Sequence, residues 1–441
     1  MDSTHCGNGI VLAMDTARDF TGGYVRRVID TELDELFSQL PAILLDGPKG
    51  VGKTATARQR ARTVRRLDVP AEAAVIEAAP AIVAGGATPV LIDEWQRVPA
   101  VWDAVRRLVD EDPSGGQFLL TGSPPGAGTH SGAGRIDVVR MRPLSFYERF
   151  DVAATVSFAG LLSGDQSKIT GRSPFNLADY VDQIIAGGFP GIRHLSGRAL
   201  TQRLDGYVDR IVDHDLPEVG FVARRPEALR AWMRAYAAAT ATTASWETIR
   251  DAATSGLSDK PARKTTTAYT DLLKVLRVLD PIDAWQPTYN HLSRLGAAPK
   301  HHLADPALAA RLLGQTRRHL LAGDEGAIPV PRDSTLLGSL FESLVALSVR
   351  SFAQSVGART YHLRTEAGRH EIDFIIERDG AVLAVEAKLT AAIYDSTVRH
   401  LHWLAKAIGT DMVNMVVVTT GPEAYRRRDG VAVVPLGILG P

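Results

Sequence analysis

Residues Gly47 to Thr54 read Gly-Pro-Lys-Gly-Val-Gly-Lys-Thr. The stretch fits G-x-x-x-x-G-K-[ST], the P-loop or Walker A pattern, at every fixed position. Glycines let backbone N–H groups converge on phosphate oxygens, and the positive end of the following helix favours the anion. We expect Lys53 to reach the β and γ phosphates and the Thr54 hydroxyl to hold Mg²⁺. The predicted nucleotide-binding residues are Gly47, Pro48, Lys49, Gly50, Val51, Gly52, Lys53 and Thr54.

The sequence around this loop has the order of a βαβ unit. An apolar run at 42–45 precedes it, and we expect a helix over 54–66 after it. Two further short aliphatic runs lie at 89–92 and 117–120. Short apolar runs bounded by polar helical stretches are typical of buried parallel strands. The pattern therefore predicts an α/β domain with a parallel sheet.

Polar residues follow the second and third runs. Asp93 and Glu94 end the run at 89–92. We expect Asp93 to bind Mg²⁺ through water beside Thr54, and Glu94 to polarise the attacking water. Thr121 and Ser123 end the next run, where a hydroxyl could sense the γ-phosphate or orient the water. The second carboxylate favours ATP hydrolysis, and a small-molecule P-loop kinase remains the alternative that does not need it.

Composition sets broad limits on the 441-residue chain. It is 45% hydrophobic and 23% charged, as an ordinary globular protein is. Fifty basic residues balance 50 acidic ones, which argues against a wholly basic nucleic-acid coat but leaves room for a local patch. One cysteine, Cys6, excludes an intrachain disulfide framework and a Cys-rich zinc site. Without a recognisable signal peptide or a long apolar run, we expect a cytoplasmic protein with no membrane segment.

The C-terminal region contains a strong hairpin signal. Asp379-Gly380 lies between the apolar segments 371–377 and 382–388. Asp-Gly favours a two-residue hairpin loop, which would pair Asp373 with Glu386.

The same register would pair Glu371 with Lys388. Because side chains alternate along a strand, all four polar residues are expected on one face, opposite an apolar face. Clustered carboxylates bind Mg²⁺ or Mn²⁺, and a neighbouring lysine can orient a water or stabilise developing charge. The alternative is an ion-pair ladder in which Lys388 neutralises Glu371.

These motifs together resemble a known family. G-P-K-G-V-G-K-T, L-I-D-E-W-Q, L-L-T-G-S, G-R-I-D-V-V-R-M-R-P-L-S-F-Y-E, G-G-F-P and L-G-S-L-F-E-S-L-V resemble the AAA+-type ATPases of bacteria and archaea that carry a DUF4143 region, over roughly residues 25–435. The resemblance implies ATP binding, and it makes Arg135 an arginine finger or sensor arginine in an oligomer. The Asp…Glu-x-Lys hairpin resembles the PD-(D/E)XK nuclease superfamily. That resemblance implies catalytic roles for Asp373, Glu386 and Lys388, and makes Glu342, on a helix expected at 334–352, a third metal ligand.

A middle region favours a winged helix. Two amphipathic helices are expected at 246–253 and 266–279, with a small basic cluster of Lys260, Arg263 and Lys264 between them. Such residues can lie near DNA phosphates, whereas a helical linker or protein-contact module is the alternative.

The predicted fold class is α/β, with a P-loop AAA+-type parallel sheet, a helical lid, a winged-helix-like module and a C-terminal α/β nuclease-like domain. The expected function is Mg²⁺-dependent ATP hydrolysis coupled to a nuclease-like domain acting on DNA or RNA. The alternative is an ATP-dependent regulatory or interaction protein with a catalytically silent nuclease-like domain; a homo-oligomer or protein partner fits either. The expected parts are an N-terminal segment (1–24), the ATPase domain (25–150), the helical lid (151–240), the winged-helix-like module (241–295) and the nuclease-like domain (296–441).

Overall fold

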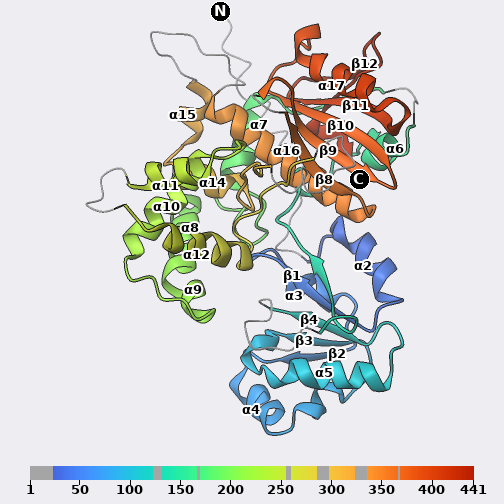
Figure 1. Cartoon of the computed structure of the whole chain (residues 1–441). Helices are drawn as coiled ribbons and strands as arrows, with labels where there is room; N and C mark the ends of the chain where they lie inside the picture. The colour runs from blue at the N-terminus through green and yellow to red at the C-terminus, as the bar shows by residue number, and fades with distance from the viewer. Residues whose placement is uncertain are drawn as a thin grey trace, which may run out of the picture.

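The computed structural model describes residues 23–122, 132–165, 169–254, 260–285, 297–322, 335–365 and 368–441. Figure 1 shows one sheet at each end of the molecule, with a group of helices beside them. Most of the expected N-terminal segment, 1–24, lies outside the described residues.

The first sheet is parallel and has five strands in the order β2-β3-β4-β1-β5. The predicted runs at 42–45, 89–92 and 117–120 form three of them, which confirms the α/β expectation. The strands are β1 (Ala42–Asp46), β2 (Thr63–Arg66), β3 (Val90–Asp93), β4 (Phe118–Thr121) and β5 (Asp137–Arg140).

The expectation of a helix over 54–66 is wrong for the second half of that range. Helix α3 spans Lys53–Arg58, and the chain then turns into strand β2. In β2, Thr63 pairs with Val90 of β3. A four-residue edge strand is too short to show a period of two, although the β-branched pair Thr63-Val64 favours a strand.

Helices cover both faces of this sheet. Ile43 and Leu45 belong to a core cluster shared with α2 (Ile29–Phe37), whereas Leu44 belongs to a second cluster shared with α5 (Ala100–Glu111). Helix α4 (Pro70–Ala78) lies on the α5 side through Ile76. The central strands β1, β3 and β4 are therefore apolar on both faces, as their uninterrupted aliphatic sequences predict.

The second sheet has seven strands, in the order β7-β12-β13-β11-β10-β9-β8. Helix α16 (Leu336–Ser355) packs on one face and α17 (Asp395–Ile408) on the other. The strands are β7 (Gly171–Arg172), β8 (Arg359–Arg364), β9 (Glu371–Arg378), β10 (Ala381–Lys388), β11 (Met412–Thr419), β12 (Glu423–Arg426) and β13 (Ala432–Pro435).

The predicted hairpin register is confirmed. Phe374 pairs with Val385, and Arg378 pairs with Ala381 across the Asp379-Gly380 turn. Both turn residues have positive φ, 53° and 85°, as a two-residue hairpin turn of this kind requires. The expectation of a single apolar face is wrong, because Ile372 and Ile375 pack on the α17 side while Phe374 packs on the α16 side.

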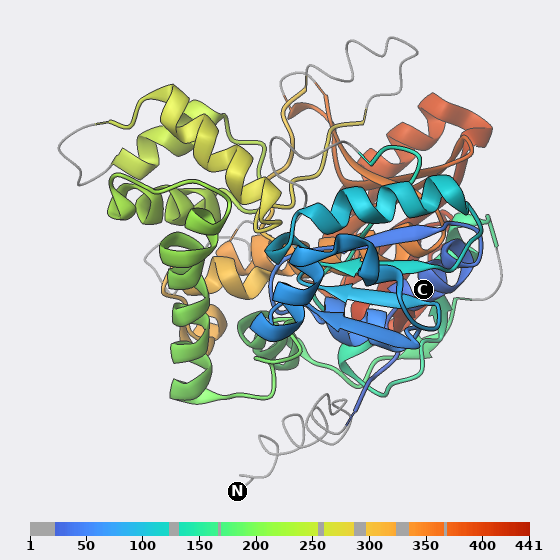
Figure 2. The same ribbon diagram turned by 90° about the horizontal axis from the view of Figure 1, so that it is seen from below.

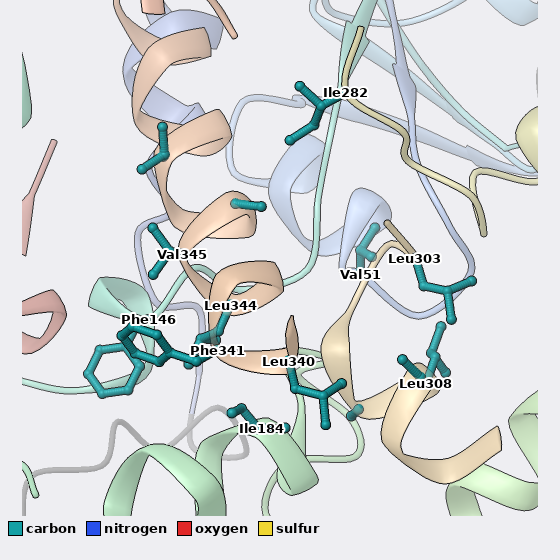
Figure 3. Close-up of a cluster of buried hydrophobic side chains, with 14 of the residues drawn as sticks. Val51, Phe146, Ile184, Ile282, Leu303, Leu308, Leu340, Phe341, Leu344 and Val345 are labelled. Atoms are coloured by element: carbon teal, nitrogen blue, oxygen red, sulfur yellow. The ribbon is translucent and has the colours of Figure 1, made fainter. Parts of the chain in front are cut away.

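Helix α16 crosses the centre of the molecule. Leu340, Phe341 and Leu344 contact a core to which Phe146 and Ile184 also belong (Figure 3). The helix is long and apolar enough to cross a membrane, yet 72% of its apolar window is buried inside the protein. Burial on this scale is typical of the core helix of a globular fold.

The helical lid was expected to begin at residue 151. The described residues between 151 and 172 pack instead against C-terminal strands. Strand β6 (Val156–Ser157) pairs with β14 (Leu439–Gly440), and β7 pairs with β12. Helix α6 (Phe158–Leu162) packs on β10 and β11. Two-residue strands carry no periodic signal, so their place in the C-terminal sheet is not visible in the sequence.

The helices between residues 197 and 275 form a group beside the first sheet (Figure 2), whereas α7 packs on α16 and α15 packs on α7 (Figure 1). The predicted helices at 246–253 and 266–279 correspond to α11 and α12, while residues 286–296 of the expected winged-helix-like module lie outside the described part of the chain. Lys260, from the expected basic cluster, is ion-paired with Glu247 and Asp251. The helices are α7 (Leu177–Ala186), α8 (Gly197–Arg210), η4 (Ile211–Asp215), α9 (Leu216–Glu218), α10 (Pro226–Ala238), α11 (Trp246–Thr254), α12 (Arg263–Val275), α14 (Pro306–Leu312) and α15 (Arg317–Ala322).

Candidate functional site

The loop 47–54 joins the carboxyl end of β1 to the amino end of α3. Gly50 and Gly52 have φ values of 80° and 97°, a region that side chains with a Cβ rarely adopt. At Gly47 an added Cβ would lie 2.1 Å from the carbonyl oxygen of Met141. The glycines are therefore required by the backbone path, which turns the loop over the start of α3.

Lys53 lies inside the curve of this loop. Its Nζ donates to the carbonyl oxygens of Gly47 at 2.6 Å and Pro48 at 3.2 Å. Burial lowers the pKa of Lys53 to about 8, against the opposing charges of Asp46 and Glu94. The ammonium group is thus held at the position where the pattern predicts phosphate.

The ends of β3 and β4 bring three predicted side chains together. The Thr54 hydroxyl donates to Asp93 Oδ1 at 2.7 Å, and the Thr121 hydroxyl donates to the same oxygen. A hydroxyl and a carboxylate are oxygen ligands of the kind Mg²⁺ prefers, so this set fits the ion. Ser123, the other predicted hydroxyl, lies outside the described residues.

Glu94 is held by its neighbours in the L-I-D-E-W-Q motif. Its φ of 56° turns the chain sharply after β3, and Gln96 Nε2 donates to Glu94 Oε2 at 2.5 Å. Trp95 is buried against Trp102, with ring centroids 4.8 Å apart. The buried Trp95 side chain therefore anchors the turn that carries Glu94.

Arg135 lies away from this chain's own loop. It precedes β5, at the amino edge of a parallel sheet whose carboxyl edge carries the loop 47–54. Its Nε lies 2.6 Å from Asp110 Oδ1 of α5. In this chain Arg135 does not meet Lys53, so a role at a nucleotide would require a second copy.

The helical group covers the loop, and this contact was missed from the sequence. Lys49 Nζ lies 2.8 Å from Asp215 Oδ1 and 2.6 Å from Glu218 Oε2. The Tyr207 hydroxyl donates to the Lys49 carbonyl oxygen at 3.0 Å. Phe189 of the G-G-F-P motif lies 3.9 Å from the position that a Cβ on Gly50 would occupy. These contacts span more than a hundred residues of sequence, and no local pattern marks them.

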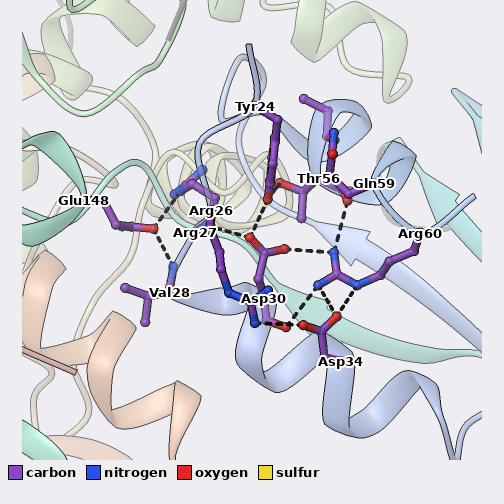
Figure 4. A network of polar contacts seen from close by, with 11 residues as sticks. Tyr24, Arg26, Arg27, Val28, Asp30, Asp34, Thr56, Gln59, Arg60 and Glu148 are labelled. Carbon is purple, nitrogen blue, oxygen red and sulfur yellow. Dashed lines mark hydrogen bonds and ion pairs between the residues drawn. The ribbon is translucent and has the colours of Figure 1, made fainter. Parts of the chain in front are cut away.

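A polar network fixes the helices around the loop (Figure 4). The Tyr24 hydroxyl donates to Asp30 at 2.6 Å and to Thr56 of α3 at 3.2 Å. Arg27 is ion-paired with buried Glu148 at 2.7 Å. Burial alone would raise the pKa of Glu148, but the Arg27 guanidinium and several hydrogen bonds hold that pKa below its ordinary value. The S-F-Y-E motif thus ends in a carboxylate that ties the segment after β5 to residues 27 and 28, just before α2.

The C-terminal carboxylates are gathered around a lysine that the sequence analysis missed. Lys300 is fully buried, and its Nζ lies 2.8 Å from Glu342, 3.0 Å from Asp373 and 3.6 Å from Glu371. Its neighbours in sequence, Pro299 and His301, give no periodic signal. The carboxylate cluster, as we call Glu342, Glu371, Asp373 and Glu386, therefore has a cation of its own.

Lys388 reaches the other side of the same cluster. Its Nζ lies 3.1 Å from Glu386 and 3.6 Å from Asp373. The expected pairing of Lys388 with Glu371 is therefore replaced by a pairing of Lys300 with Glu371. Lys300 lies outside the predicted hairpin, in a segment that pairs with Ile282, so the hairpin sequence alone could not predict this contact.

Burial separates the pKa values within the cluster. Burial and the Asp373 charge raise the pKa of Glu342 to about 7, and they raise that of Glu386 well above its ordinary range. Burial would raise the pKa of Asp373 too, but Lys300 and Lys388 hold it far below its ordinary value. The Lys300 and Lys388 ammonium groups already contact Glu342, Asp373 and Glu386, and two cations among these oxygens do not fit a Mg²⁺ or Mn²⁺ ion.

Family models match three parts of the chain. Residues 39–150 match an AAA domain, which supports ATP binding and hydrolysis by this part of the chain. Residues 337–439 match the domain of unknown function DUF4143, and residues 177–319 match the domain of unknown function DUF8612. The chain thus combines an AAA domain with a DUF4143 region.

Two curated relatives align along most of the chain. The uncharacterized proteins Rv2008c of Mycobacterium tuberculosis and Mb2031c of Mycobacterium bovis are each 25% identical over 420 residues, covering 93% of this chain and 83% of theirs.

Two solved structures are also similar in part. The Walker-type ATPase PABY2304 of Pyrococcus abyssi is 16% identical and has a TM-score of 0.39, over 67% of this chain and 98% of that one. The ORC2 protein of Aeropyrum pernix is 15% identical and has a TM-score of 0.27, over 71% of this chain and 93% of that one. At these TM-scores neither structure adds to the argument.

Proposed function

We propose that the protein is a Mg²⁺-dependent ATPase whose nucleotide state controls a nuclease-like but catalytically silent C-terminal domain. The observation that carries the ATPase is the meeting of Thr54, Asp93 and Thr121 beside Lys53. In this proposal the Lys53 ammonium binds the β and γ phosphates. Thr54 and Asp93 would hold a Mg²⁺ ion, which would supply neutralisation of the phosphate charge. Glu94 orients and polarises the water.

The experiment is release of phosphate from ATP with Mg²⁺ in the absence of any acceptor. Sustained release supports hydrolysis. If phosphate appears only on an added small molecule, the protein is a kinase and the role given to Glu94 is wrong. We also propose a cytoplasmic location. If the protein is an oligomer, we propose that Arg135 of a second copy acts as the arginine finger at the nucleotide.

Coupling between the two sites is supported by a short ribbon, residues 278–284 and 298–304. Its two halves are joined by hydrogen bonds between Ile282 and Lys300, and from Asp280 N to the carbonyl oxygen of His302. Just before the ribbon, Arg277 Nε lies 2.5 Å from Asp46, the residue that precedes the phosphate loop. On the opposite half of the ribbon, Lys300 binds the carboxylate cluster.

Asp280 links the ribbon to both domains. It lies 2.8 Å from Arg142, which follows β5, and 2.9 Å from Arg350 of α16. Burial would raise the pKa of Asp280, but these arginines hold it far below its ordinary value. Removing a partner from a buried charge is strongly destabilising, so we propose that the ribbon keeps these contacts and moves with Asp46 as one body.

Substitution of Lys300 tests whether the carboxylate cluster is catalytically silent. Replacing Lys300 with methionine leaves buried acidic groups without their cation, which costs about 3–5 kcal/mol in similar buried pairs. We expect Lys300→Met to unfold at a lower temperature and to regain stability with millimolar Mn²⁺, because the ion relieves carboxylate repulsion. Thermal unfolding without nucleotide is the measurement.

Wild type and the double variant Lys300→Met/Asp373→Asn are the matched controls. Both are expected to show no Mn²⁺-dependent stabilisation. A comparable shift in the wild type, together with metal-dependent cleavage of DNA or RNA lost on Asp373→Asn, would contradict the silent cluster and favour an active nuclease.

A further inference from the structure

A positively charged and aromatic surface lies at the edge of the carboxylate cluster. It consists of Arg369 and His370 before β9, and Arg399, His400, Trp403 and Lys406 on α17. Arg399, Trp403 and Lys406 are spaced as i, i+4 and i+7, so they follow one face of the helix. We call these six residues the α17 surface.

The positive charges of this surface are not neutralised nearby. In the described part of the chain, no carboxylate lies within ion-pair distance of Arg369, Arg399 or Lys406, and all three are exposed. The acidic residue one turn before Arg399 is Asp395, which is ion-paired with Arg427. The surface therefore attracts anions.

Its aromatic rings form a compact platform, in which two rings are parallel and the third stands nearly perpendicular to them. His370 stacks on Trp403 with ring centroids 3.9 Å apart and planes 6° apart, and His400 meets His370 edge-on at 5.4 Å. Arg399 Nε donates to His400 Nε2 at 2.9 Å, and His400 Nδ1 lies 2.9 Å from the carbonyl oxygen of Glu371. The platform is thereby fixed to the first residue of β9.

Charge and stacking together select one class of partner. Guanidinium and ammonium groups bind a phosphate backbone, and an aromatic face in their midst stacks an unpaired base. Bases in a duplex are stacked on each other and do not present a face. We propose that the α17 surface binds single-stranded nucleic acid and guides it past the carboxylate cluster. This inference names the partner of the domain in the proposed function, but does not depend on ATP hydrolysis.

The test is fluorescence anisotropy of a labelled single strand of about 20 nucleotides, longer than the ~4–16 nucleotides that one binding fold contacts. The full-length double variant Arg369→Gln/Arg399→Gln is expected to bind at least about tenfold more weakly. The slope of log K against log salt should fall by about 1.4, since each phosphate contact on a single strand contributes about 0.7. His370→Ala should weaken binding about tenfold with little change in that slope.

Arg359→Gln/Arg428→Gln is the matched control, because both arginines are exposed in the same domain outside the α17 surface. It should bind like the wild type. Equal binding by Arg369→Gln/Arg399→Gln, equally tight binding of a duplex, or equal competition by the sulfated polysaccharide heparin would overturn the proposal. Phosphate release by the same preparations separates this failure from a failure of the ATPase assignment.

Discussion

Replacing Lys53 with alanine is expected to lower kcat/KM for ATP by at least about 100-fold, the effect of removing one preorganised charge from a developing anion. The ammonium lies inside the phosphate loop, 2.6 Å from the Gly47 carbonyl oxygen, and burial lowers its pKa to about 8. Negative phosphates would favour its charged form. Phosphate release and binding of a fluorescent ATP analogue are the measurements.

Arg359→Ala is the control for this substitution, because Arg359 is exposed on β8 in the other domain and lies outside the α17 surface. It should hydrolyse ATP at the wild-type rate. Wild-type binding and turnover by Lys53→Ala would show that the loop 47–54 is not the nucleotide site.

Replacing Glu94 with glutamine is expected to lower kcat by about 100- to 1000-fold while leaving ATP affinity within about threefold, because general-base groups contribute on that scale. Glutamine keeps the size of the side chain and the contact with Gln96, but it cannot polarise water. Thr54 and Asp93 remain to hold Mg²⁺. Single-turnover hydrolysis and equilibrium binding distinguish the two effects.

Glu77→Gln is the matched control, since Glu77 is exposed on α4 and lies on the α5 side of the same domain. Its kinetics should equal those of the wild type. If Glu94→Gln hydrolyses ATP normally, Glu94 has no role in the reaction; if it fails to bind ATP, its role is structural.

Local patterns predicted the parts of the fold that local chemistry determines. The loop 47–54 follows from glycine spacing, and the strands around it follow from short aliphatic runs. The hairpin register follows from Asp379-Gly380 alone, and the structure pairs Phe374 with Val385 as that turn requires.

Long-range contacts account for what the sequence did not predict. Asp215 binds Lys49 across 166 residues, and Lys300 binds Asp373 across 73. Neither partner has a distinctive spacing, because a buried ion pair requires only that two segments meet. Very short strands, such as β6 and β7, were missed because two residues cannot show alternation.

Coupling between the nucleotide site and the carboxylate cluster is tested most directly by hydrogen exchange of residues 371–388 in Glu94→Gln, with and without ATP and Mg²⁺. We expect ATP to change the exchange of this hairpin, and Arg277→Gln, added to Glu94→Gln, to abolish the change while ATP still binds. The reason is that Arg277 joins Asp46 to the ribbon that carries Lys300. Unchanged exchange on ATP binding, or an undiminished change without Arg277, would contradict the account.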